Sequence, residues 1–427
     1  MGDFYQNGIV TNFHNLRQRN TEELEKDLLK FSKRRPISVL IPCLYSELER
    51  PALQRIVDEL SQVPYIKEIV IGLDRADAEQ FAAAQRYFAK LPQRFRILWQ
   101  DGPRLRELDS RLQQLGLSPA EPGKGRNVWF CYGYILASAR SEVVVLHDAD
   151  IITYSRDMLA RLAYPIANPD FSYAFCKGYY ARVADHRLNG RVSRLLVTPL
   201  LRALKKIFGT HEYLEYLDSF RYPLAGEFSM RVDVFHDLRI PSDWGLEIGV
   251  LSEVKRSYST RRLCQVDIAD AYDHKHQPLS EEDPQAGLSK MSRDIAKALF
   301  RKLATTGIEF NQETFRTLKA TYYRIALDFI ETYYDDALMN GLNVDRHEEE
   351  KAVELFARNI LDAGQQFLEN PMEQPFIPSW RRITSAIPDM LELLYEAVEA
   401  DNGPSADQAP DVRSIPTPAR DGAGGPR

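Results

Sequence analysis

Two aspartates, Asp148 and Asp150, come shortly after the apolar run Val143-Val-Val-Leu146 and are separated by one alanine. Alternate side chains of an extended chain point to the same face, so both carboxylates would project together where a buried strand ends. Adjacent carboxylates repel each other unless a cation lies close to them. Their oxygens suit Mg²⁺ or Mn²⁺, which commonly retain waters and substrate phosphates as further ligands. The pattern favours a divalent-metal site over the alternative, a polar turn in which Asp150 caps the next helix.

A glycine-rich turn, Pro122-Gly-Lys-Gly-Arg126, precedes an apolar helical stretch. Glycines allow the backbone to approach a ligand closely, and Lys124 would offer a point charge to a diphosphate. The turn has neither the spacing nor the Ser or Thr of a Walker A loop. An ordinary glycine-rich turn is the alternative that this segment, taken alone, leaves open.

The segment Asn189-Gly-Arg-Val-Ser193 stands where a helix is expected to begin. Backbone N–H groups at a helix start, together with the Arg191 guanidinium and the Ser193 hydroxyl, would form a site for a small anion. The alternative is an ordinary helix cap, in which these groups serve only the helix.

Two further segments carry acids or histidines whose role the residues alone leave open. Leu224-Ala-Gly-Glu227 is followed by Trp244-Gly-Leu-Glu247, and Glu247 opens an otherwise apolar helix. A carboxylate in that position either complements the helix dipole or accepts hydrogen bonds from sugar hydroxyls. Asp273-His-Lys-His276 offers imidazoles, which are common metal ligands, although a pair of histidines is more often a surface feature.

Strands and helices alternate around these segments and must position them. This alternation predicts an α/β fold with a mostly parallel sheet covered by helices on both faces. Ligands bind such sheets at the carboxyl ends of the strands, so residues 42–47, Asp74 and the two aspartates are the informative ones. The expected strands are 37–44, 68–74, 95–99 and 142–147, and the expected helices are 51–60, 77–91 (with Asp77 as its cap) and 127–139.

The chain divides into four predicted regions. Residues 1–35 read as a polar lead-in with one helix, 21–32. Residues 36–300 form the main domain, whose first half is 36–150 and whose second half, 151–300, mixes strands near 171–183 and 263–268 with helices near 192–207 and 245–257. Residues 301–400 are almost purely helical, with long amphipathic stretches. The segment 401–427, with five prolines and four glycines, is expected to be a disordered tail.

Composition narrows the class of function. The 427 residues carry 55 basic and 61 acidic side chains, a net charge of -6, which argues against a polycation for nucleic acid. The four cysteines show no CxxC pairing and are expected to be buried thiols. The amino-terminal segment lacks the apolar core of a signal peptide, and no apolar run approaches the length of a membrane span. We therefore expect a cytoplasmic protein without a membrane partner.

The order of the chemical segments is more specific than any one of them. A strand end near Pro42, the PGKG turn, the DxD strand end, the NGRVS segment, the GE pair, WGLE and an HxxxP segment follow one another. This order resembles the retaining GT-A glycosyltransferases, most closely the glucosyl-3-phosphoglycerate synthases, over about residues 36–300, and Leu288-Ser-Lys-Met-Ser-Arg293 is similar as well. The resemblance implies a GT-A fold (Rossmann-like), and it does not account for the helical region beyond about residue 305.

The resemblance also implies roles for individual residues. Asp150, helped by His274, would ligate Mg²⁺ or Mn²⁺, while Leu224 and Ala225 would present backbone groups at the reacting centre and Glu247 would bind hydroxyls of the transferred sugar. The acceptor, 3-phosphoglycerate, would be bound by Gly190, Arg191 and Ser193, with Trp244 nearby. The sugar nucleotide would be bound by Pro42, Cys43, Leu44, Glu47, Asp74, Lys124, Asp148 and Gly226.

Two departures from the family pattern affect the donor and the acceptor. Tyr45-Ser46-Glu47 stands where Asn-Glu-Glu is usual, so one carboxylate is missing beside the nucleotide. His276 and Gln277 replace an Asn and an Arg near the metal-binding histidine, and Lys275 could supply part of the lost charge.

The reaction implied by the resemblance is transfer of glucose from UDP-glucose, or GDP-glucose, to 3-phosphoglycerate with retention of configuration. A relative that transfers mannose or uses free glycerate is an alternative within enzymes. A non-catalytic sugar-nucleotide-binding scaffold, working through the helical region, is the alternative of another class. The family is dimeric, so a homodimer is expected through the helical region, with packing against the main domain as the alternative.

Overall fold

The computed structural model describes residues 6, 8–119, 123–274, 283, 287–372 and 376–403. The predictions for Pro122, Lys275, His276 and Gln277, and for the tail from residue 404 onward, lie outside these residues. Within the described ranges, no helix is both long and apolar enough to cross a membrane.

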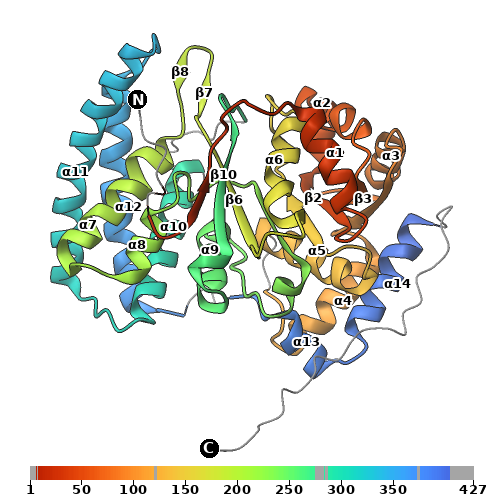
Figure 1. Ribbon diagram of the computed structural model, residues 1–427. Coiled ribbons are helices and arrows are strands. Elements are labelled where there is room, and N and C mark those ends of the chain that lie inside the picture. Colours follow the sequence, from red (N-terminus) through yellow and green to blue (C-terminus); the bar gives the residue numbers. More distant parts are fainter. Residues whose placement is uncertain are drawn as a thin grey trace, which may run out of the picture.

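An eight-stranded sheet forms the centre of the molecule (Figure 1). Its order is β1-β10-β6-β9-β5-β2-β3-β4, and every neighbouring pair is parallel except the two that involve β9. The predicted mostly parallel sheet is therefore confirmed. The strands are β1 (Thr11–Phe13), β2 (Ile37–Leu44), β3 (Ile66–Asp74), β4 (Arg94–Trp99), β5 (Val143–Leu146), β6 (Phe175–Tyr180), β9 (Phe228–Arg231) and β10 (Leu263–Ala269), with a separate hairpin of β7 (Val183–Ala184) and β8 (Arg187–Leu188).

Helices cover both faces of the sheet because successive strand residues face opposite ways. In β2, Leu40 joins one apolar core while Val39 and Ile41 join the other. The first core holds α4 (Pro103–Gln114) and α5 (Lys124–Ser138). The second holds α1 (Thr21–Phe31), α2 (Pro51–Ser61), α3 (Ala78–Phe88) and α6 (Arg156–Ala167).

Local sequence signals explain where several of these helices begin. Asp77 caps α3 as predicted, because its side chain accepts a hydrogen bond from the Gln80 N–H at 2.9 Å. Helix α6 begins only after Ser155, so the alternative in which Asp150 caps the next helix is wrong. Helix α4 was not predicted, although Pro103 stands at its first position.

The first 35 residues contribute to the main sheet. Strand β1, for which the sequence carried no strand prediction, pairs in parallel with β10 at the edge of the sheet. The predicted helix in this region is α1, which a capping box of Asn20 and Glu23 starts and which packs against α6. The polar lead-in thus supplies both an edge strand and a covering helix.

The second half of the chain adds short helices and then the helical region. A π-helical turn, η2 (Val192–Val197), runs directly into α7 (Thr198–Phe208) and is contacted by α10, α11 and α12. Helix α9 (Leu246–Ser257) lies beside the sheet, and α8 (Glu212–Asp218) packs on α7. The remaining helices are α10 (Gly287–Ala304), α11 (Gln312–Met339), α12 (Arg346–Glu369), α13 (Trp380–Ala386) and α14 (Met390–Asn402).

The C-terminal helices pack on the main domain at two separate places (Figure 1). Helices α11 and α12 lie against α7 and η2. Helix α14 returns to the far end of the molecule and packs on α4, α5 and β4. There Asn402 bonds both backbone groups of Ile97 in β4, at 2.9 and 2.8 Å. The alternative of packing against the main domain is therefore what the structure shows for these helices.

Candidate active site

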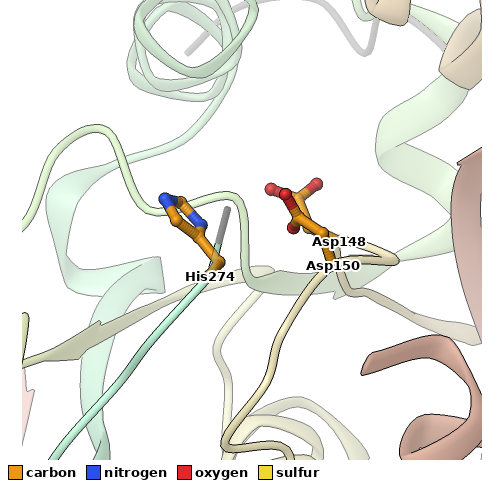
Figure 2. Close-up of side chains that lie close together, drawn as sticks. All are labelled: Asp148, Asp150 and His274. Carbon is orange, nitrogen blue, oxygen red and sulfur yellow. The ribbon is translucent and has the colours of Figure 1, made fainter. Parts of the chain in front are cut away.

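Asp148, Asp150 and His274 come together at the base of a cleft (Figure 2). Strand β5 ends at Leu146, and the turn that follows presents both aspartates. A backbone bridge between Ile151 and His274 ties the segment after β10 to this turn. One ligand atom from each of the three side chains lies within 4.8 Å of the others, and Figure 2 shows the imidazole beside the two carboxylates. The structure therefore joins Asp148 to the two residues predicted as metal ligands.

The chemistry of this group fits a divalent cation. Burial and the neighbouring Asp148 carboxylate raise the pKa of Asp150 to about 7, as expected for two carboxylates held close together. Asp148 itself stays ionised, because Lys124 lowers its pKa even though burial opposes that shift. Two carboxylates and one imidazole leave positions for phosphate oxygens and waters around Mg²⁺ or Mn²⁺.

Lys124 connects the two halves of the site from the first residue of α5. Its Nζ lies 2.7 Å from Oδ1 of Asp148 and 3.2 Å from Oε1 of Glu247. The residues on either side of Lys124 must be glycine, because a Cβ on Gly123 or Gly125 would lie 2.3 or 2.0 Å from backbone carbonyl oxygens of residues 241–242. The glycine-rich turn therefore lets α5 begin close to the carboxylates.

Leu224, Ala225 and Gly226 form a backbone loop that lies against Asp148. A Cβ on Gly226 would lie 2.3 Å from Oδ2 of Asp148, so only glycine fits at this approach. The carbonyl of Ala225 accepts a hydrogen bond of 2.5 Å from Nζ of the fully buried Lys177 in β6. Burial lowers the pKa of Lys177 to about 8. The buried Lys177 amine thus holds the loop that was predicted at the reacting centre.

Two buried glutamates lie near this loop, and each accepts hydrogen bonds from other side chains. Glu227 accepts hydrogen bonds from the hydroxyls of Tyr180 and Tyr272, at 2.7 and 2.6 Å, and burial raises its pKa. Glu247 occupies the first turn of α9, as predicted, and accepts a hydrogen bond from Lys124. The helix-dipole interpretation and the ion pair with Lys124 are compatible, because the helix start and the Lys124 ammonium both place positive charge beside this carboxylate.

The cleft has a volume of about 1210 Å³ and runs from the metal-binding group to the C-terminal helices. On the acceptor side it is lined by Gly190, Arg191, Trp244 and Leu224 from the predicted set. Ser193 is buried behind this surface and does not line the cleft. Gly190 has a φ of +78°, which favours glycine at the point where the chain turns into η2.

The predicted nucleotide-side residues lie at the ends of β2 and β3, next to the main cleft rather than in its lining. Leu44 pairs with Asp74 across the two strands. The Cys43 thiol is buried, and the charges of Glu47 and Asp150 add to the burial that raises its pKa. Pro42 precedes Cys43 in the same strand. These residues therefore lie at the carboxyl ends of the strands, on the same side of the sheet as Asp148 and Asp150.

Three residues of the site were missed by sequence reasoning. Arg182 lines the cleft close to Gly190, and its Nη1 donates to the Tyr222 hydroxyl at 3.4 Å. It follows the end of β6, so the rule that ligands meet strand ends could have found it. Lys177 lies within the same strand, where it reads as part of an apolar run. Glu349 comes from α12, and no local signal marks it.

Comparisons with known proteins extend over nearly the whole chain. No protein-family model matches it. It is 45% identical over 402 residues to the glucosyl-3-phosphoglycerate synthase of Persephonella marina, covering 94% of this chain and 99% of the relative. It is 40% identical over 403 residues to the enzyme of the same name from Methanococcoides burtonii, covering 93% and 98%.

Solved structures share the fold. The glucosyl-3-phosphoglycerate synthase of Mycobacterium tuberculosis in complex with phosphoglyceric acid matches with a TM-score of 0.51 and 23% identity, over 71% of this chain and 90% of that one. The same enzyme with Mn²⁺, uridine diphosphate and glucosyl-3-phosphoglycerate matches with a TM-score of 0.51 and 22% identity, over 71% and 89%. The predicted GT-A fold with added C-terminal helices is confirmed. By its similarity to relatives along almost its full length, the chain belongs to the glucosyl-3-phosphoglycerate synthase family.

Proposed function

We propose that the protein transfers glucose from UDP-glucose to 3-phosphoglycerate with retention of configuration, in a reaction that requires Mg²⁺ or Mn²⁺. The observation that carries the proposal is one cleft that holds both Asp148, Asp150 and His274 within 4.8 Å of one another and the guanidinium of Arg191. Further support comes from the names of the relatives and from the complexes of the Mycobacterium tuberculosis enzyme with UDP-glucose, Mn²⁺ and phosphoglyceric acid.

The donor half is assigned to residues 36–150. Pro42, Cys43, Leu44, Glu47 and Asp74 would contact the base and ribose at the ends of β2 and β3. Asp148, Asp150 and His274 would hold the cation, which when bound offsets the negative charge of the diphosphate. Lys124 adds a fixed positive charge beside the same carboxylates, and Gly226 leaves room for them.

The acceptor half is assigned to residues 151–300. Arg191 would bind a carboxylate or phosphate of 3-phosphoglycerate through paired N–H donors, and Gly190 would offer its backbone. Trp244 lines the same part of the cleft, and Arg182 adds a second cation. Ser193 is buried, so it would support this surface from inside the protein and would not line the cleft.

A front-face displacement suits the groups at the reacting centre. Glu227 accepts hydrogen bonds from two tyrosine hydroxyls, and Glu247 is paired with Lys124, so neither carboxylate is disposed to attack the sugar. The acceptor oxygen would form its bond to the anomeric carbon as the bond to the diphosphate breaks, and the hydroxyl proton would pass to the departing phosphate oxygen. Leu224 and Ala225 would face this centre with their backbone, and Glu247 would orient sugar hydroxyls. A sugar covalently attached to Glu227 or Glu247, detected by mass spectrometry of the intact protein, would contradict this scheme.

The decisive experiment offers the purified protein four donors, UDP- or GDP-linked glucose or mannose, with Mg²⁺ and either 3-phosphoglycerate or glycerate. The proposal expects phosphorylated product from UDP-glucose and 3-phosphoglycerate. A preference for GDP-glucose, for mannose or for glycerate would select the corresponding alternative enzyme. Absence of transfer from all donors, with nucleotide binding retained, would favour the sugar-nucleotide-binding scaffold.

The remaining assignments concern partners and location. We infer a homodimer, because Leu338 and Met339 are exposed at the C-terminal end of α11 in the helical region. Light scattering that finds only monomer at assay concentration would contradict it. The net charge of -6 supports a role without nucleic acid, and we further propose a cytoplasmic enzyme that works without a membrane.

A further inference from the structure

A carboxylate from the C-terminal helices accepts hydrogen bonds from two arginines on the acceptor side of the cleft. Glu349 lies on α12, is only 3% exposed and lines the cleft. Its Oε1 accepts a hydrogen bond from Nε of Arg191, and its Oε2 accepts one from Nη1 of Arg194, both at 2.8 Å. One carboxylate from the helical region therefore bridges two arginines that stand at the start of the π-helical turn η2.

Arg194 makes several further contacts within the protein, whereas Arg191 lines the cleft. Arg194 also donates to the carbonyls of Asn189 and Leu188, at 2.8 and 3.3 Å, and its guanidinium lies 4.9 Å from the centre of the Tyr333 ring. Arg191, whose side chain is 33% exposed, lines the cleft, and among the described residues only its Nε has a hydrogen-bond acceptor. Both terminal NH₂ groups of Arg191 therefore remain for an anion.

Charge explains why the bridge is needed. Two guanidinium groups three residues apart on one turn repel each other, and Arg194 is almost fully buried. Glu349 offsets this repulsion while leaving the pair of arginines with a net positive charge. Because a guanidinium is planar, fixing Nε also fixes the direction in which its terminal donors point.

We propose that Glu349 is a positioning residue for the acceptor, which orients Arg191 toward the anionic group of the triose acid. The helical region would then complete the acceptor site, in addition to packing on the main domain. This inference rests on the proposed function, since it takes the ligand of Arg191 to be the anionic acceptor.

The first test compares Glu349→Gln with the wild-type enzyme, using Mn²⁺, UDP-glucose and 3-phosphoglycerate. The variant keeps the side-chain shape and removes the charge, so the KM for 3-phosphoglycerate should rise about tenfold while the KM for UDP-glucose stays within twofold. A matched control is Glu399→Gln. Glu399 also bridges two arginines at 2.8 Å, Arg94 and Arg96, but does so on α14 away from the cleft. The Glu399→Gln variant should have a lower melting temperature and an unchanged KM for 3-phosphoglycerate.

The second test asks whether Glu349 acts through Arg191. Arg191→Gln should raise the acceptor KM, and adding Glu349→Gln to it should raise that KM no further, because the positioned group is already gone. Independent losses that multiply in the double variant would overturn the proposal in favour of general destabilisation. If Glu349→Gln does not fold, Glu349→Asp, which keeps the charge and withdraws the carboxylate, replaces it in both comparisons.

The outcomes separate this inference from the function on which it rests. A wild-type enzyme that does not glucosylate 3-phosphoglycerate would refute the proposed function, whatever the variants do. A wild-type enzyme that does so, together with a folded Glu349 variant whose acceptor KM stays within twofold of wild type, would refute the positioning role alone.

Discussion

Lys124 and Asp148 form an ion pair of 2.7 Å at the base of the cleft, between the first turn of α5 and the turn after β5. The pair is largely shielded from solvent, and the pKa of Lys124 is raised because the attraction of Asp148 and Glu247 outweighs the opposing effect of burial. Removing one partner of such a pair leaves an uncompensated charge beside Asp150. The pair therefore links the start of α5 to the turn that carries both aspartates.

Lys124→Met tests this relationship. We expect kcat to fall about 100-fold, because a fixed positive charge beside the departing diphosphate is lost. Steady-state kinetics with saturating Mn²⁺ would measure the fall. Lys205→Met is the matched control, since Lys205 also lies between two carboxylates, Glu215 at 2.8 Å and Asp218 at 3.0 Å, on a surface away from the cleft. An equal fall in both variants would point to lost stability instead.

His274→Ala tests the metal-binding group. Loss of one of three protein ligands should weaken Mn²⁺ binding in the presence of UDP by about 100-fold, and chelation followed by Mn²⁺ should restore activity in the wild type only. Isothermal titration calorimetry measures the affinity. His211→Ala, at the start of α8, should bind Mn²⁺ as the wild type does. Unchanged Mn²⁺ affinity in His274→Ala would remove His274 from the site.

Gly226→Ala tests the close approach of the backbone loop to the aspartates. The added methyl group would lie 2.3 Å from Oδ2 of Asp148, so the carboxylate or the loop has to shift. We expect kcat to fall by about tenfold or more, with a folded protein by circular dichroism. Gly116→Ala, in a surface turn with a φ of +65° and open space around it, should cost about 1 kcal/mol of stability and no activity. Full activity in Gly226→Ala would show that the approach is not needed.

Lys177 provides a prediction for pH. Burial lowers its pKa to about 8 from an ordinary value of 10.5, so between these values the unfolded chain binds more protons than the folded one. The free energy of unfolding should therefore rise with pH in this window, by about 2 kcal/mol from this group, whereas below pH 8 its cost is constant. Denaturant unfolding of wild type and Lys177→Met at pH 7.5 and pH 10 measures the difference. A difference between the two proteins that does not change with pH would contradict the prediction.

The base of the site was predictable because its signals are local. The two aspartates that follow the apolar run of β5, the glycine-rich turn around Lys124 and the backbone of Leu224–Gly226 are each marked by a recognisable local pattern, and the sheet rule brings strand ends together. Within the first 150 residues, the strands β2 to β5 and the helices α1, α2, α3 and α5 followed from apolar periodicity for the same reason, whereas β1 and α4 were not predicted.

The parts that could not be predicted depend on contacts between distant segments. Glu349 is one acidic residue among several on a helix, and only the packing of α12 against η2 gives it two arginines. Ser193 was predicted on the binding surface, but the π-helical turn buries it. Strand β1 has only three residues, and its pairing with β10 could not be read from so short a run.

The chain itself limits the pairing capacity of both edges of the central sheet. On one side the three-residue β1 is the edge strand, and on the other Asn402 occupies the backbone groups of Ile97 in β4 as a neighbouring strand would. Exposed strand edges invite pairing with other chains and aggregation, and short or covered edges suppress it. Self-association through continuation of the sheet is thus disfavoured, which agrees with the proposed homodimer through the helical region.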